Sequence, residues 1–310
     1  MLKIAHFVLL SFFFCAIACT NQQSEPIREE APVKPTFIEQ KFKLPAIPSE
    51  MNFCDEIIDL TDIDIRERLD RELLINTYYH SSTILYLKRA NRFFPKIESI
   101  LKEENLPSDI KYLAVAESGL SQATSPAGAK GFWQFMPQTG QEYGLVINNK
   151  IDERYHLEKS TRAACQYLKA SKEKLESWFS AIASYNRGVG GVQSDMNWQG
   201  TEDYFDTYMN NETGRYVFRM LALKLIMENP TAYGFDLDAS ELYQPYETIS
   251  VNVVDGIDDV ADWSKQHNTN YKIVKLLNPW ITSNSLPKSE SLMIQLPAET
   301  MNLNPRSKGN

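Results

Sequence analysis

A chain of 310 residues, of which 43% are hydrophobic and 11% aromatic, is long enough for one large domain or for a medium and a small one. Its formal net charge of −8 excludes the basic surface patch of a nucleic-acid-binding protein, so no nucleic-acid partner is expected. The four histidines are scattered without the spacing of metal ligands, and we therefore expect no metal and no cofactor.

The N-terminal residues carry a predicted export signal. Lys3 is followed by a mostly apolar run to Cys19, which is too short to span a membrane comfortably and is typical of a signal peptide. The run ends in AIAC, which resembles the bacterial lipobox, although Ala stands where the lipobox usually has Leu. We expect residues 1–18 to be a lipoprotein signal peptide and Cys19 to be acylated, which would anchor the chain to a membrane. The alternative is an ordinary secretory signal that is cut near Ala18.

Residues 19–48 are polar and rich in proline, which indicates a tether between the anchor and the folded region. Thr20, rather than Asp, follows Cys19, and this favours the periplasmic face of the outer membrane if the host has such a membrane. Apart from the acylated Cys19, the chain beyond the signal peptide keeps two cysteines, Cys54 and Cys165, and the sequence leaves open whether they form a disulfide.

From about Asp59 to Asn229, apolar residues recur at three-to-four spacing in IRERLDRELLINTYY, ILYLKRANRFFPKIESILKEEN and RYVFRMLALKLIMEN. Strand signals are absent from this region, so we expect a helical domain over residues 49–236. The pattern changes after it. YETISVNVV and SLMIQLP alternate as strands do, while DDVADWSKQHN and YKIVKLLNPW between them are helix-like. Residues 243–298 are therefore predicted to form a small β-α-α-β module, and the fold class is mainly α.

One carboxyl group lies in an apolar stripe of the helical region. Ile110, Leu113, Ala114 and Glu117 share one face of a predicted helix that Gly119 ends. Burial and the negative end of the helix dipole both favour the protonated carboxyl, so we expect the pKa of Glu117 to rise to about 6. A general acid needs that state. The alternative is a structural glutamate bonded to buried backbone or to an arginine.

Two further segments bear on the chemistry. A loop of small residues around Ser125 permits close approach of a ligand, and FWQFMP follows it with the amide of Gln134. Aromatic faces suit a sugar ring, although an apolar run of this kind is usually core. WFSAIASYNRGVGGV is predicted to be a helix that runs into a glycine-rich break, with Tyr185 and Asn186 at its C-terminal end.

Together the three segments resemble the lytic transglycosylase family of the soluble type, whose catalytic domain has a lysozyme-like fold. The family pattern is E-S, then G-x-x-Q-x-M-P, then A-Y-N before a glycine-rich turn. Ser184 replaces the Ala of the third motif. In this sequence the pattern stands as Glu117-Ser118, Gly131-Phe132-Trp133-Gln134-Phe135-Met136-Pro137 and Tyr185-Asn186.

The chain also resembles the membrane-bound lytic murein transglycosylase D-like subgroup, which has Trp before the Gln of the second motif. NETGRYVFRMLALKLI looks like a segment of that subgroup in which a tyrosine, matching Tyr216, faces the substrate groove. The resemblance covers roughly residues 50–235. It implies that peptidoglycan glycan strands are the partner and that the substrate-binding residues are Ser118, Ser125, Gln134, Met136, Tyr185, Asn186 and Tyr216.

The same resemblance implies a reaction with one catalytic carboxyl group. Glu117 would protonate the glycosidic oxygen between N-acetylmuramic acid and N-acetylglucosamine, and the 2-acetamido oxygen would stabilise the cationic centre. The carboxylate would then take the proton of the muramic C6 hydroxyl, which closes a 1,6-anhydro ring without consuming water. A hydrolytic muramidase of the same fold, with a distant second acid such as Asp152 or Glu212, is one alternative. An inactive peptidoglycan-binding lipoprotein is another.

The C-terminal module resembles a degenerate LysM domain, a small peptidoglycan-binding unit. Leu277-Asn278-Pro279 and the closing MIQLP fit that pattern, whereas the usual opening G-D-T-L is replaced by GIDD. Glycan binding by this module is left open, and a purely structural appendage is the alternative. Because the motifs lie before residue 190 and Tyr216 before residue 236, we expect the module to be dispensable for the chemistry.

Overall fold

A computed structural model describes residues 44–289 and 291–299. The predicted signal peptide, the lipidation site Cys19 and most of the tether lie outside the described residues. At the end of the tether, residues 44–48 have no regular secondary structure.

The folded region begins with a β-hairpin that the sequence analysis did not predict. Strand β1 (Glu50–Phe53) pairs antiparallel with β2 (Glu56–Asp59), and the turn between them places Cys54 and Asp55 at φ 52° and 64°. Short hairpins usually have glycine or asparagine at such positions. The Cys54-Asp55 pair therefore gave no turn signal in the sequence. The side chain of Asp109 accepts a hydrogen bond of 2.8 Å from the Cys54 N–H and so holds the turn.

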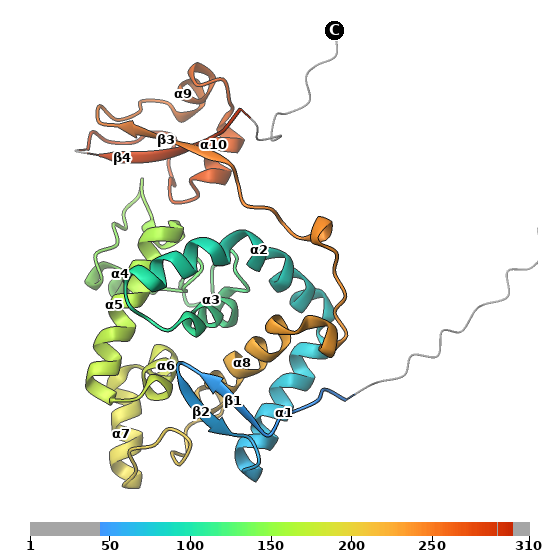
Figure 1. Ribbon diagram of the computed structural model, residues 1–310. Helices are drawn as coiled ribbons and strands as arrows, with labels where there is room; N and C mark the ends of the chain where they lie inside the picture. Colours follow the sequence, from blue (N-terminus) through green and yellow to red (C-terminus); the bar gives the residue numbers. More distant parts are fainter. Residues whose placement is uncertain (1–43, 290, 300–310) are drawn as a thin grey trace, which may run out of the picture. The chain divides into compact units, whose positions relative to one another are not determined.

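The long predicted helices are confirmed as α1 (Ile63–Tyr78), α2 (His80–Glu103) and α8 (Asn211–Glu228). The Asn210 side chain caps α8 by accepting from the first backbone N–H groups of that helix. Helix α1 packs along α8, so the first and last helices of this region lie side by side (Figure 1).

Five further α-helices lie between α2 and α8 in the chain. The predicted break after residue 187 is confirmed but is short, because Gly188 alone, at φ 77°, separates two helices and the chain is helical again from Val189. A single residue with positive φ redirects the chain here, and this leaves no irregular loop. The five helices are α3 (Lys111–Ser118), α4 (Pro137–Glu142), α5 (Leu157–Leu175), α6 (Trp178–Arg187) and α7 (Val189–Gln199).

Helix α3 lies in the interior of this helical region, and Leu113 and Ala114 on it are fully buried. The aromatic residues of the FWQF segment pack in the same core. Phe132, Trp133 and Phe135 are at most 3% exposed, and the Trp133 Nε1–H donates a 2.9 Å hydrogen bond to the Thr161 hydroxyl. These rings are therefore core side chains, and the expectation that they offer faces to a sugar ring is wrong.

The predicted β-α-α-β order of the C-terminal module is confirmed. Strand β3 (Thr248–Val253) pairs antiparallel with β4 (Leu292–Pro297), and α9 (Val260–Gln266) and α10 (Tyr271–Leu277) come between them in the chain. The module has its own apolar cluster, which Ile151 from the helical region joins.

Cys54 and Cys165 are both buried and carry free thiols. Burial raises the pKa of Cys165 to about 12, and it raises the pKa of Cys54 as well, so neither thiol ionises readily. Within residues 44–289 and 291–299, no helix combines the length and the apolar character needed to cross a membrane.

Candidate active site

Glu117 lies on the last turn of α3, which Gly119 ends in the left-handed conformation at φ 59°. A Cβ atom at Gly119 would also approach the ring of Tyr86 to 2.4 Å. Glycine is therefore required there for both its conformation and its size. Because the helix ends at this residue, the Glu117 carboxyl group is presented at the rim of the core.

The carboxyl group of Glu117 titrates near neutral pH. Its residue is half-buried, and loss of solvation raises the pKa from 4.5 to about 7, in the direction that the sequence predicted. The Tyr216 hydroxyl donates a hydrogen bond to Oε1, and this bond and the charge of Arg219 hold the pKa below what burial alone would produce. Near pH 7, Glu117 can therefore both donate and accept a proton.

Two tyrosines are held beside this carboxyl group. Tyr216 is 2% exposed, whereas Tyr185 is half-buried and donates a 2.8 Å hydrogen bond from its hydroxyl to the carbonyl oxygen of Trp133. Burial first, and the negative charge of Glu117 second, raise the pKa of both hydroxyls well above the usual value. Both tyrosines consequently remain neutral hydrogen-bond donors.

Ser118 connects α3 to the following loop. Its Oγ lies 2.9 Å from the Phe132 carbonyl oxygen and 3.1 Å from that of Ala114, and it accepts from the Ser121 N–H. This side chain holds the loop against the helix end that carries Glu117.

The residues from 123 to 136, called the motif loop here, form a compact turn of their own. The Ser125 Oγ accepts a 3.0 Å hydrogen bond from the Ala129 N–H. Gln134 adopts φ 47°, and its Nε2 donates to the carbonyl oxygens of Gly131 at 2.8 Å and Ala123 at 3.2 Å. Ser125 and Gln134, nine positions apart in the sequence, thus lie on one ordered loop.

The remaining predicted residues lie on either side of these groups. Met136 is 42% exposed and immediately precedes α4. Asn186, exposed at the end of α6, accepts a 2.8 Å hydrogen bond on Oδ1 from the Thr213 hydroxyl. This contact ties α6 to the beginning of α8, the helix that carries Tyr216.

A charged group that the sequence analysis missed lies on α8. Arg219, one turn after Tyr216, pairs with Glu212 at 3.2 Å and lies 3.8 Å from the buried carboxylate of Glu72 on α1. Arg215 pairs with Glu72 at 2.6 Å. The spacing of positions 212, 215, 216 and 219 on one helix face was visible in the sequence. The sequence did not show that α1 places the buried carboxylate of Glu72 opposite this face.

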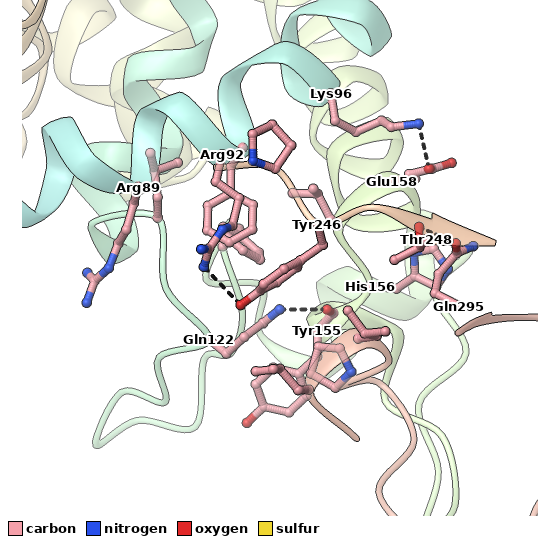
Figure 2. A pocket seen from close by; sticks show the side chains of 18 of the residues that line it. Arg89, Arg92, Lys96, Gln122, Tyr155, His156, Glu158, Tyr246, Thr248 and Gln295 are labelled. Atoms are coloured by element: carbon pink, nitrogen blue, oxygen red, sulfur yellow. Dashed lines mark hydrogen bonds and ion pairs between the residues drawn. The ribbon is translucent and has the colours of Figure 1, made fainter. Parts of the chain in front are cut away.

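A separate cleft of about 820 Å³ lies between α2, residues 120–122, the segment 243–250 and the C-terminal module, and Glu117 is not among its lining residues. Figure 2 shows Arg92 reaching across it to Tyr246, whose hydroxyl accepts a 2.9 Å hydrogen bond from Nη1. Lys96 pairs with Glu158 at 2.9 Å in the same view. Arg92 and Lys96 thus have partners within the chain.

Residues 95–207 match the transglycosylase SLT domain, and residues 249–300 match the soluble lytic transglycosylase C-terminal LysM-like domain. The chain is similar to membrane-bound lytic murein transglycosylase D of Escherichia coli (strain K12), at 31% identity over 183 residues, which are 57% of this chain and 40% of that protein. The same protein of the E. coli strain CFT073 matches with the same identity and coverage. The chain thus corresponds to less than half of these relatives.

A crystal structure of an inactive mutant of lytic transglycosylase Slt from Pseudomonas aeruginosa matches with a TM-score of 0.34 and 20% identity, over 49% of this chain and 26% of that one.

Proposed function

We propose that this chain, whose residues 95–207 match the transglycosylase SLT domain, is a peptidoglycan lytic transglycosylase, a lyase that acts on polysaccharide. It would cleave the β-1,4 bond between N-acetylmuramic acid and N-acetylglucosamine without water and leave 1,6-anhydro ends. The observation that carries this proposal is the Glu117 carboxyl group, half-buried in the matching region, with a pKa of about 7 and a tyrosine hydroxyl bonded to it.

In the proposed reaction Glu117 begins protonated and gives its proton to the glycosidic oxygen as the bond from C1 breaks. The 2-acetamido oxygen of the same sugar stabilises C1 in the interval. The Glu117 carboxylate then accepts the proton of the C6 hydroxyl while O6 bonds to C1. Glu117 gives one proton and takes one back, so it ends protonated again. A pKa near the working pH suits a group that acts in both directions.

The neighbours of Glu117 have matching roles in this proposal. The Tyr216 hydroxyl and the Arg219 charge both favour the carboxylate that exists between the two proton transfers, because each lowers the Glu117 pKa. Ser118 keeps the motif loop against α3. Substrate binding is assigned to the motif loop through Ser125, Gln134 and Met136, and to Tyr185 and Asn186 on α6.

The hydrolytic alternative needs a second acid, and the two candidates have other partners. Asp152 is buried, which by itself favours its neutral form, but hydrogen bonds and charge from Arg154 outweigh this and hold its pKa below the usual value. Glu212 pairs with Arg219 at 3.2 Å. Carboxylates engaged in this way are poor bases for activating a water molecule, which supports the single-acid reaction.

We also propose the cell envelope as the location, with a lipid anchor at Cys19 on the periplasmic face of the outer membrane. The proposed organisation is a signal peptide over residues 1–18, a tether over 19–48, the catalytic domain over 49–236 and the LysM-like module over 243–298. A role of that module in glycan binding is part of this proposal.

Digestion of purified sacculi in water labelled with heavy oxygen tests the proposed reaction. Mass spectrometry should find products that end in 1,6-anhydromuramic acid and carry no label. Labelled reducing ends would instead establish hydrolysis, and intact sacculi after prolonged incubation would refute both enzymatic readings.

A further inference from the structure

Arg154 and Asp152 form an ion pair that is almost sealed from solvent. The Arg154 Nε donates to Asp152 Oδ1 at 2.9 Å and Nη2 donates to Oδ2 at 2.7 Å, and the two side chains are 4% and 5% exposed. Burying two charges costs desolvation energy that the pairing only roughly offsets, so such a pair is weak evidence for stability. The remaining contacts of the pair indicate another role.

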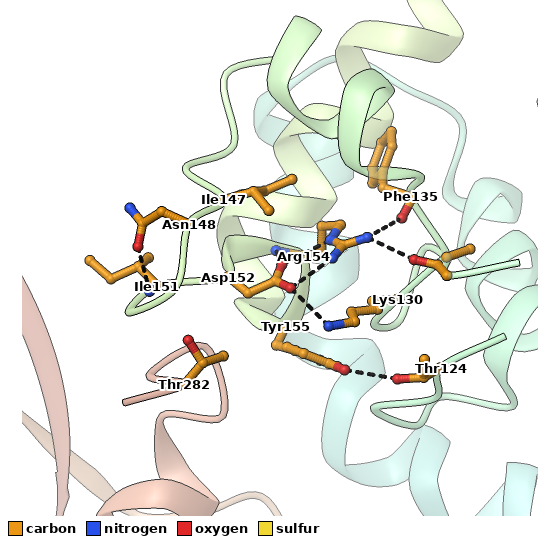
Figure 3. A network of polar contacts seen from close by, with 12 residues as sticks. Thr124, Lys130, Phe135, Ile147, Asn148, Ile151, Asp152, Arg154, Tyr155 and Thr282 are labelled. Atoms are coloured by element: carbon orange, nitrogen blue, oxygen red, sulfur yellow. Dashed lines mark hydrogen bonds and ion pairs between the residues drawn. The ribbon is translucent and has the colours of Figure 1, made fainter. Parts of the chain in front are cut away.

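The remaining nitrogen of the Arg154 guanidinium group, Nη1, forms hydrogen bonds to the motif loop. Its Nη1 donates to the carbonyl oxygens of Gly128 at 2.9 Å and Phe135 at 3.2 Å, which lie on either side of the turn that carries Gln134 (Figure 3). Lys130 of the same loop reaches Asp152 Oδ2 at 3.4 Å. A single planar group therefore fixes Gly128 and Phe135 of the loop relative to residues 152–154.

The backbone of Arg154 also restricts which residue can stand at position 131 of the loop. A Cβ atom at Gly131 would lie 1.9 Å from the Arg154 carbonyl oxygen, so the two backbones are in close contact. The loop is secured by the hydrogen bonds of the Gly131 N–H to Ala123 and of the Lys130 N–H to Phe135, at 3.0 and 3.1 Å.

The C-terminal module docks on the same stretch, residues 150–156, called the bracket here. The Asp152 N–H donates to the Trp280 carbonyl oxygen and the Thr282 N–H to that of Lys150, each at 2.9 Å. Between these bonds, the Ile151 side chain is 5% exposed and belongs to the apolar cluster of the module. The bracket thus holds the motif loop with the Arg154 side chain and the module with its backbone and Ile151.

We propose that Arg154 is a positioning residue for the motif loop and that the docked C-terminal module holds the bracket in place. Its effect on glycan binding rests on the proposed function, in which this loop supplies Ser125 and Gln134. Lysine cannot substitute, because it has a single point charge in place of a fork that reaches three acceptor groups at once. The module is then needed for full glycan binding, whereas the chemistry at Glu117 would still not require it.

The first test is Arg154→Lys in the full chain, with Arg162→Lys as the matched control. Arg162 on α5 also pairs with two carboxylates, those of Glu103 and Glu104, but it is half-exposed. Steady-state turnover of soluble glycan strands should show KM raised by about tenfold in Arg154→Lys, with kcat changed by less than about threefold, because binding geometry is lost while Glu117 is intact.

The shape of the pH profile should remain that of the wild type, and the control should keep the wild-type KM. A purely structural Arg154 would behave differently. In that case Arg154→Lys would lower the folded fraction, and therefore kcat per total protein, and leave KM unchanged. That result would overturn the proposal.

Hydrogen exchange supplies a readout that does not need activity. The amides of Lys130 and Gly131 should exchange about tenfold faster in Arg154→Lys than in the wild type, while those of α3 keep their rates, because only the local opening of the loop changes. If wild-type protein forms no anhydro product, the proposed function fails and this measurement still decides the positioning role. Unchanged exchange of the loop amides would refute it.

The part of the module is tested with Ile151→Ala, which shortens a side chain of the bracket and leaves the module's own residues intact. Ile57→Ala is the control, because Ile57 on the hairpin is 73% exposed. Faster exchange of the Lys130 and Gly131 amides and a raised KM in Ile151→Ala alone are expected. If the Thr282 amide exchanges faster while the loop amides and KM stay at wild-type values, the module does not support the loop and that part of the proposal is wrong.

Discussion

The Tyr216 hydroxyl on α8 donates a hydrogen bond to the Glu117 carboxyl group at the end of α3, across 99 positions of the sequence. The bond lowers a pKa that burial raises, and the balance comes to about 7. Both directions of proton transfer are therefore open to Glu117 near neutral pH. The first three predictions follow from this balance.

Replacing Glu117 by Gln should abolish formation of anhydro products while the fold is retained. General acid-base catalysis contributes about 10²–10⁴-fold, and the loss should be at least that large because one group serves both steps. Product formation by mass spectrometry, sacculus binding and the melting temperature should be measured on one preparation. Glu142→Gln, at an exposed position on α4, is the control. A Glu117→Gln variant that melts well below the wild type yet still cleaves would make Glu117 a structural residue.

The substitution Tyr216→Phe should raise the Glu117 pKa above about 7, because it removes the hydrogen bond that favours the carboxylate. Because Glu117 must begin protonated, the alkaline limb of the kcat/KM profile should consequently move to higher pH. The maximal rate should fall, because the hydroxyl no longer stabilises the carboxylate that exists between the two proton transfers. Tyr208→Phe, at a position that is 88% exposed, should leave the profile unchanged. A profile of Tyr216→Phe that superimposes on the wild type would mean that the bond does not tune Glu117.

Glu117 should also make stability depend on pH. Its pKa rises from 4.5 to about 7 on folding, so the folded state holds the proton more tightly than the unfolded state does. This contribution is complete below pH 4.5 and is lost as the pH rises to about 7. The melting temperature of Glu117→Gln relative to the wild type should therefore increase between these values and level off above them. A difference that stays constant over this range would contradict the raised pKa.

Gly131→Ala should destabilise the protein strongly and disorder the motif loop. The residue adopts φ 79°, and the new Cβ would collide with the Arg154 carbonyl oxygen at 1.9 Å. Gly144→Ala is a matched control, because Gly144 has φ 83° but open space around it. Conformational strain should lower the free energy of unfolding of Gly144→Ala by only about 1–2 kcal/mol, and that of Gly131→Ala should fall further. Urea unfolding of both variants measures the difference, and equal losses would show that the contact is relaxed.

Local patterns in the sequence account for much of the helical region and of the C-terminal module. The apolar spacing that predicts α1, α2 and α8 is a property of residues three and four positions apart, and Gly119 ends α3 as expected. The stripe that contains Glu117 also correctly predicted a raised pKa. In each case neighbouring residues contain the physical cause, because a helix is formed by contacts between positions that are close in the chain.

Two features were missed for a shared reason. The hairpin turn at Cys54 is held by Asp109, and the FWQF aromatic side chains pack into a core made by distant helices. Each outcome depends on a partner far away in the sequence. The residue types within each segment therefore could not predict the turn or distinguish a buried aromatic side chain from one that faces a ligand.

The sequence by itself determined the helices, the strand-helix-helix-strand module and the candidate acid, because period and residue type carry that information locally. Only the tertiary structure decided that Tyr216 and Arg219 act on Glu117 and that Arg154 grips Gly128 and Phe135. It also decided that the C-terminal module docks on the bracket instead of standing apart. These contacts join irregular segments and separate helices whose backbone directions have no periodic signature, so they exist only once the whole chain is packed.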